Sequence, residues 1–150
     1  MSAPARSRSR SAARLAAVQA LYQQEMERTP VAMLLHEFHH HRLGATIEDV
    51  EYAEAEVDFF DDLVRGTSER KAELDQLISA RLAKGWALAR LDKPMLQILR
   101  VGAYELVARI DVPTATVISE HIDVAKAFYG NKEAAFVNGL LDAVAKDVRG

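Results

Sequence analysis

Residues 93–113, KPMLQILRVGAYELVARIDVP, contain the pattern that decides the fold. Pro94 stands where a helix can begin, and the apolar residues after it recur at helical spacing. Gly102 lies inside this predicted helix, where glycine lowers helix propensity, so we expect a neighbouring helix to approach closely there. The segment DVP, residues 111–113, then ends the helix. The apolar positions of the helix are Leu96, Leu99, Ala103 and Leu106.

Helical spacing of apolar residues continues along the rest of the chain, and no segment alternates as a strand does. Further helices are predicted at about residues 11–28, 31–42 and 116–129, and through one long stretch at 60–82. Gly130 is predicted to stop the helix at 116–129, and Asn131 to cap the last helix. The helix at 11–28 has a predicted buried stripe of Leu15, Val18, Tyr22 and Met26. We therefore expect an all-α fold of about seven helices in a single compact domain, residues 1–150, with residues 1–10 as a flexible basic arm.

Charge is distributed unevenly along the chain. Residues 1–24 hold four of the nineteen basic residues and none of the twenty-two acidic ones, a net charge of +4, which leaves −7 for the other residues. A basic segment on an acidic body indicates an anionic partner, with nucleic acid first among the candidates. Two other interpretations stay open: an organelle transit peptide, and a basic tail that is merely solvated.

The sequence also limits the compartment. It contains no cysteine, which favours a reducing compartment and excludes thiolate metal sites. No apolar run is long enough to span a bilayer, and no secretory signal is recognisable. We expect a cytoplasmic protein with no membrane partner.

Catalytic and metal-binding motifs are missing as well. The sequence has no glycine-rich phosphate loop and no nucleophile elbow. His36, His39 and His40 recur at i, i+3 and i+4, but a zinc site needs a further ligand and an ordered outer shell, so a solvated or partly buried histidine patch is the better interpretation. We predict no enzyme activity, no catalytic residue, no metal and no cofactor. Three carboxylates at the expected start of the long helix are predicted to be solvated: Asp58, Asp61 and Asp62.

Arginines with nearby aromatic residues indicate a surface for single-stranded RNA. On a helical wheel, Arg10 and Arg14 lie together on the flank of the first helix's buried stripe. Phe136 falls about a quarter-turn from the centre of the last helix's buried face, so we expect a half-exposed ring that stacks on an unpaired base, with packing into the core as the alternative. Lys132 lies one turn earlier on the same side, where the helix start adds a positive field. A further pair of this kind, in the helix after Pro94, is Arg100 and Tyr104.

Three segments together resemble the NusB family of bacterial transcription antitermination factors: RLAAVQALYQQE (14–25), ILRVGAYELVARIDVP (98–113) and AKAFYGNKEAAFVNGLLDAVAK (125–146). The resemblance spans nearly the whole chain. It implies an all-helical fold of two small bundles that binds boxA-containing RNA of rRNA leader transcripts. It also implies a protein partner, the small-subunit ribosomal protein that doubles as NusE, and a place in the RNA polymerase antitermination complex of rRNA operons.

The resemblance also carries RNA-binding roles onto single positions. We expect the Tyr22 ring to pack while its hydroxyl reaches RNA. The positions that the family motifs assign are Arg6, Arg8, Arg10, Arg14, Tyr22, Arg100 and Phe136, to which the helical wheel adds Lys132.

The sequence departs from the family pattern in three places. Serine alternates with arginine in the basic segment, where family members often have an unbroken basic run, so we expect fewer phosphate contacts. Met95 stands where relatives often carry a charged residue, which bears on any RNA or NusE surface transferred from them. Residues 31–56, including the histidines, match no family motif.

Two alternatives stay open. A NusB-type fold also occurs as an RNA-binding appendage of rRNA cytosine methyltransferases, and a stand-alone relative of that appendage would bind RNA without antitermination. The enzyme itself requires a following cofactor domain, which we do not expect because the sequence stops at Gly150. The second alternative is a helical protein–protein adaptor, for which the arginine cluster would be incidental.

Overall fold

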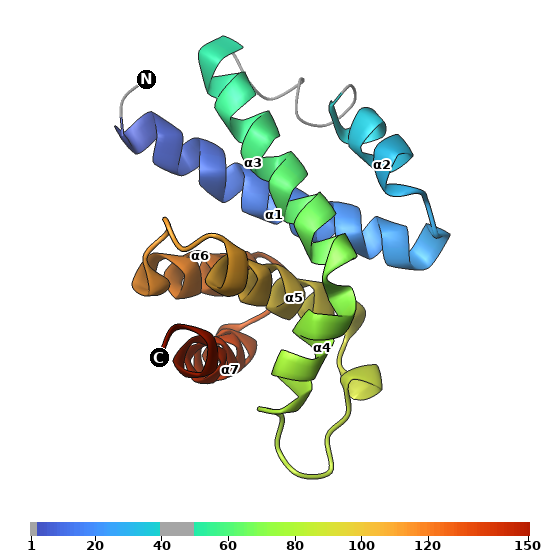
Figure 1. Ribbon diagram of the computed structural model, residues 1–150, viewed down its shortest axis with the longest axis vertical. Helices are drawn as coiled ribbons and strands as arrows, with labels where there is room; N and C mark the ends of the chain where they lie inside the picture. Colours follow the sequence, from blue (N-terminus) through green and yellow to red (C-terminus); the bar gives the residue numbers. More distant parts are fainter. Residues whose placement is uncertain (1–2, 40–49) are drawn as a thin grey trace. The chain divides into compact units, whose positions relative to one another are not determined.

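Seven α-helices and a short 3₁₀-helix make up the regular structure of the described residues, and no strand occurs among them (Figure 1). The computed structural model describes the backbone of residues 3–39 and 50–150 and the side chains of residues 8–39 and 57–150. The predicted all-α fold of about seven helices is confirmed. In chain order they are α1 (Ala3–Glu27), α2 (Val31–Phe38), α3 (Val50–Glu69), α4 (Lys71–Ser79), η2 (Leu88–Arg90), α5 (Lys93–Ala108), α6 (Thr114–Phe128) and α7 (Asn131–Arg149).

The chain divides into two compact units, residues 1–68 and residues 69–150. Unit 1 holds α1, α2 and all but the last residue of α3, and unit 2 holds α4 to α7 with η2. Two small helical bundles are what the family resemblance implies. That residues 1–150 act as a single domain with a flexible arm stays a prediction. No helix in the described ranges combines the length and the apolar character needed to cross a bilayer.

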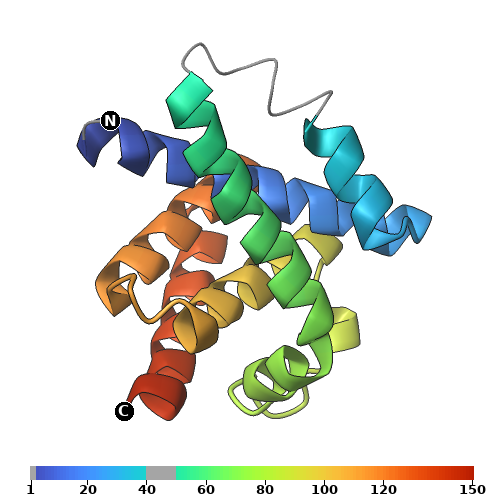
Figure 2. The same ribbon diagram turned by 45° about the horizontal axis from the view of Figure 1, so that its top comes forward.

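In unit 1, α2 folds back along α1, and α3 crosses α1 (Figures 1 and 2). The rings of Phe38 in α2 and Phe60 in α3 are stacked, with their centroids 5.5 Å apart. Leu34, Leu63 and Val64 are buried as well. Aromatic and aliphatic residues of α2 and α3 thus form much of this unit's apolar core.

The first helix differs from the prediction in its start and its buried face. It begins at Ala3, not near residue 11, and Arg28 ends it in the left-handed conformation, φ +58°. Tyr22 and Met26, predicted to be buried, are exposed, and Leu15 is half-buried. The buried face consists mainly of small residues, which a search for large apolar side chains overlooks: Ser9, Ala13, Ala17, Val18, Ala20 and Leu21.

The prediction of a single long helix at residues 60–82 is wrong. Arg70 interrupts it with φ −104° and ψ 18°, and α4 begins at Lys71. The Arg70 side chain donates from Nε to Glu73 Oε1 at 3.0 Å, which stabilises the new helix start. The three carboxylates expected at a helix start lie inside α3 instead, because α3 already begins at Val50: Asp58, Asp61 and Asp62.

Unit 2 is organised around α5, which contacts α4, α6 and α7. Every residue of α5 from Met95 to Leu106 is buried. The predicted close approach at Gly102 is confirmed, because a Cβ atom there would lie 2.7 Å from Cδ1 of Leu141 in α7. Next to this contact, His121 Nε2 and Glu105 Oε1 form a fully buried pair at 2.9 Å.

Arg149 holds the far end of unit 2 together. Its guanidinium donates to four backbone carbonyls and to Thr114 Oγ1, at 2.8 to 3.2 Å. These bonds tie the end of α7 to the link between α5 and α6, where the predicted break at residues 111–113 lies. At the other end of α7, the N-cap is Gly130 and not the predicted Asn131. The carbonyls that accept from Arg149 belong to Glu105, Leu106, Arg109 and Val112.

Candidate nucleic-acid interface

The exposed face of α1 carries two of the predicted RNA-binding residues. Arg8 is exposed, and Tyr22 is 38% exposed. The two residues are fourteen positions apart in the helix. Their directions around the helix axis therefore differ by only about 40°, and they lie roughly 21 Å apart along it. The Tyr22 side chain is more exposed than predicted. Arg6 lies in α1 by its backbone, but its side chain falls outside the described ones.

Arg10 and Arg14 pack inside unit 1. Their guanidinium carbons lie 4.6 and 5.0 Å from the ring centroid of Phe59, within cation–π range. Arg14 is only 2% exposed, so its side chain is buried and does not lie on the flank of the buried stripe as predicted. The two arginines help to hold α1 against α3, and a role of either in RNA binding stays a prediction.

Arg100 is a buried residue of unit 2. Its Nε and Nη2 atoms donate to the two carboxylate oxygens of Asp75 at 2.7 and 2.9 Å. A bidentate pair of this kind fixes the arginine side chain in both position and plane. The pair joins α5 to α4, so any contact of Arg100 with RNA would compete with Asp75.

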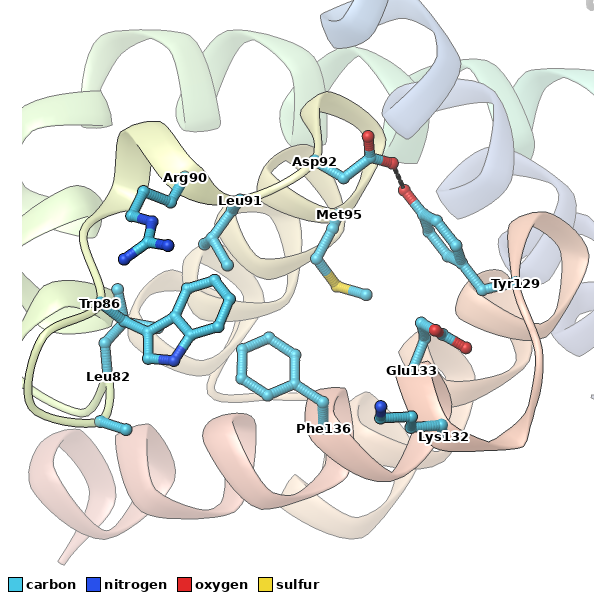
Figure 3. Close-up of a pocket in the computed structure, with 11 residues that line it drawn as sticks. Leu82, Trp86, Arg90, Leu91, Asp92, Met95, Tyr129, Lys132, Glu133 and Phe136 are labelled. Atoms are coloured by element: carbon cyan, nitrogen blue, oxygen red, sulfur yellow. Dashed lines mark hydrogen bonds between the residues drawn. The ribbon is translucent and has the colours of Figure 1, made fainter.

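Lys132 and Phe136 lie together at a cavity of about 490 Å³ in unit 2 (Figure 3). We call this cavity the Trp86 pocket. Phe136 is 39% exposed, which confirms the predicted half-exposed ring, and Lys132 lines the pocket one turn earlier in α7. Both residues belong to the first two turns of α7, where the helix dipole adds a positive field. The other lining residues are Leu82, Ala83, Trp86, Arg90, Leu91, Asp92, Met95, Tyr129 and Glu133.

Trp86 also lines the pocket, and the close-up view draws its indole beside the Phe136 ring (Figure 3). It is 52% exposed, a large fraction for tryptophan. Gly85 precedes it with φ +89°, a conformation that favours glycine, and the Trp86 amide donates to the Ala83 carbonyl at 3.0 Å. Arg90 lies over the indole at 5.0 Å and donates from Nη1 to the Gly85 carbonyl at 3.3 Å. The loop therefore holds the exposed indole in a defined position.

A hydrogen-bonded pair lies on the polar side of the pocket. The Tyr129 hydroxyl donates to a carboxylate oxygen of Asp92. Asp92 is the N-cap residue of α5, yet its side chain makes no capping bond and turns to Tyr129 instead. Burial, together with this hydrogen bond, raises the pKa of the Tyr129 hydroxyl above its usual value, so Tyr129 stays a donor. Glu133 accepts from the Gly130 amide at 3.3 Å and so caps α7.

The two described residues of the histidine patch differ in exposure. His36 is exposed, whereas His39 Nε2 lies 2.6 Å from Asp61 Oδ1 and is part-buried. This agrees with a solvated or partly buried patch for the two described histidines; His40 lies outside the described residues. Within the described ranges, no group of three His, Cys, Asp or Glu side chains is placed to hold a metal ion.

Sequence reasoning missed four residues of the pocket. No motif in the sequence marks Trp86, although a lone tryptophan next to glycine in a loop is a usable signal of an exposed ring. Arg90, Asp92 and Tyr129 carry no such signal, because they are brought together only when η2, α5 and the end of α6 pack.

The chain matches the model of the NusB family over residues 11–146. It is 70% identical to the transcription antitermination protein NusB of Novosphingobium aromaticivorans over 142 residues, which cover 95% of this chain and 96% of the relative. The corresponding protein of Sphingopyxis alaskensis is 65% identical over 144 residues, 96% of this chain and 97% of the relative.

Solved structures agree with this assignment. NusB of T. maritima has a TM-score of 0.78 at 32% identity, over 92% of this chain and 91% of that one. A structure of the antitermination factors NusB and NusE in complex with double-stranded RNA has a TM-score of 0.77 at 25% identity, over 93% and 98% of the two chains.

Proposed function

The chain belongs to the NusB family of transcription antitermination proteins, and we propose that it binds boxA-containing RNA of rRNA leader transcripts together with NusE. In this role it promotes read-through of terminators by RNA polymerase within an antitermination complex. The antitermination proteins of this family are not enzymes, which confirms the prediction of no enzyme activity.

The observation that carries the proposal is the Trp86 pocket with Lys132 and Phe136 at the start of α7. A half-exposed ring offers a stacking face to an unpaired base, and a lysine in the positive field of a helix start attracts the adjacent phosphate. The sequence alone predicts both residues as RNA contacts. The relative solved with NusE and double-stranded RNA supports the same kind of partner.

The exposed face of α1 adds a second RNA-binding surface in unit 1. Arg8 neutralises phosphate, and Tyr22 stacks on a base or donates through its hydroxyl. Arg6 lies in the same basic segment and adds to its charge.

Arg10, Arg14 and Arg100 contribute less to RNA binding than their charge suggests. Direct contact with RNA would cost Arg10 and Arg14 their packing on Phe59 and would cost Arg100 its bonds to Asp75. Their main effect on RNA binding is through the positive potential and through the packing that places α1 and α5.

A filter-binding titration tests the proposal directly. The full chain is titrated with a boxA RNA and with a scrambled strand of the same composition, with and without NusE. We expect tighter binding of boxA, and further tightening when NusE is present. Because linkage is reciprocal, boxA must tighten NusE binding by the same factor.

Equal binding of the two strands, with and without NusE, contradicts boxA recognition. Binding of NusE with no RNA binding at all identifies a helical adaptor instead.

A further inference from the structure

The Trp86 pocket has two aromatic walls on different structural elements. Trp86 comes from the loop before η2, and Phe136 comes from α7. Both rings are directed toward the same cavity (Figure 3), and both are partly exposed. A volume of about 490 Å³ falls inside the range of about 300–1,000 Å³ that is usual for small-molecule pockets. The volume and the two aromatic side chains in the lining suit a flat group of nucleobase size.

The charges around the pocket suit a nucleotide as well. Arg90 and Lys132 line it on the sides of Trp86 and Phe136, and each brings a positive charge. The lining also holds two carboxylates, and one oxygen of each already accepts a hydrogen bond: Glu133 from the Gly130 amide and Asp92 from the Tyr129 hydroxyl, which leaves each carboxylate a second acceptor oxygen. Cations beside aromatic rings are the usual equipment for unpaired bases and their phosphates.

We infer that the Trp86 pocket receives one unpaired base of the bound RNA, held between Trp86 and Phe136. This deepens the proposed function and rests on it, because it names the group that the pocket binds. Trp86 is thereby a direct RNA contact that the family motifs in the sequence do not point to.

Asp92 gives the pocket a preference among bases. A carboxylate accepts hydrogen bonds from an exocyclic amino group, as aspartate does from N4 of cytosine. Tyr129 orients this carboxylate by donating to it. A base with an exocyclic amine is therefore bound in preference to uracil.

The fluorescence of Trp86 reports occupancy of the pocket without a label, because the chain has a single tryptophan. The full chain is titrated with boxA RNA, alone and with NusE. Stacking of a base on the indole is expected to quench the emission in proportion to the RNA bound. Ile110→Ala, an exposed apolar position away from the pocket lining, serves as the control and should keep the full quench.

Abasic RNAs identify the base that enters. Each RNA of a series lacks one base, and its affinity is compared for the wild type, Trp86→Leu and Trp86→Phe. One abasic position should weaken wild-type binding by about five- to a hundredfold, the worth of one stacked base. The same position should have little effect on Trp86→Leu, while Trp86→Phe keeps most of the effect. Replacing the base at that position by uracil should lower the RNA affinity of the wild type more than it lowers the RNA affinity of Asp92→Asn.

The outcomes separate the two proposals. If boxA binds but neither quenches Trp86 nor shows a position whose effect depends on Trp86, the base pocket is refuted and the proposed function stands. If NusE changes the emission and RNA does not, the pocket docks a protein and the inference is wrong. If no RNA binds under any condition, both proposals fail.

Discussion

Phe136→Leu separates packing from RNA recognition at the Trp86 pocket. The ring is 39% exposed, so roughly three-fifths of its surface is covered. Full burial of a phenylalanine is worth about 1.5–3 kcal/mol, and leucine retains most of the covered aliphatic contact. We expect the free energy of unfolding to fall by less than about 1.5 kcal/mol. Leucine has no flat ring, so RNA affinity should fall by about 1–3 kcal/mol, roughly five- to a hundredfold.

Phe128→Leu is a matched control for this change. Phe128 is the same residue type in the same unit, it is also 39% exposed, and it does not line the pocket. Both variants are compared with the wild type by urea unfolding and by titration with boxA RNA. The two should lose similar stability, whereas only Phe136→Leu should lose RNA affinity.

Two results would refute this reasoning. One is a Phe136→Leu protein that unfolds several kilocalories more easily while its folded fraction binds boxA normally, which would make the ring a core residue. The other is an equal loss of RNA affinity in Phe128→Leu, which would show that the effect is not local to the pocket.

Three further predictions concern other parts of the chain. Gly102→Ala places a methyl group against Leu141 and should lower the free energy of unfolding by about 1–3 kcal/mol, and Gly102→Ala with Leu141→Val should recover part of it in urea melts. Arg81 holds the pKa of the Asp147 carboxyl below its usual value by hydrogen bonding, so their pair stabilises the fold above about pH 4 and loses its effect as the pH falls through the lower pKa of the folded state. Asp147→Asn should therefore be less stable than the wild type at pH 7, with the difference vanishing in acid, and an equal difference at pH 7 and pH 2.5 would exclude the pair as its cause. Arg8→Gln should flatten the log–log salt dependence of RNA affinity by about 0.7 without changing stability, whereas an unchanged slope means that Arg8 touches no phosphate.

Much of the fold follows from local sequence signals. Pro94, the break at residues 111–113 and the stop at Gly130 delimit helices in the structure close to where they were predicted. Gly102 marks a close helix contact, which gives a physical reason for the cost of a glycine inside a helix; Gly139 in α7 has no such contact, so the signal does not hold for every helical glycine. These signals are strong because each depends only on the special backbone properties of a single proline or glycine.

Other features depend on tertiary packing and were mispredicted. The buried face of α1 is built mainly from small residues, three alanines and a serine among them, whose low hydrophobicity hides them from a search for large apolar residues. The interruption at Arg70 leaves the helical periodicity on both sides intact, so the sequence pattern continues across it. Arg14 is predicted on the flank of the buried stripe, but Phe59, forty-five residues further along the chain, packs on it.

The candidate site also combines residues that a local sequence pattern predicts with residues that only tertiary packing brings together. Lys132 and Phe136 belong to one helix, so a helical wheel brings them together correctly. Trp86, Asp92 and Tyr129 come from a loop and the ends of two helices, and no local period relates them. Their part in the pocket becomes visible only when α5, α6 and α7 pack.

The central claim is that this chain promotes read-through of terminators on transcripts that carry boxA. The most direct measurement is the fraction of RNA polymerase that passes a terminator downstream of boxA in a reconstituted transcription reaction containing NusE and the other antitermination factors. Adding the full chain should raise this fraction on the boxA template and not on a template with a scrambled boxA. An unchanged fraction on the boxA template, or an equal rise on both templates, would contradict the claim.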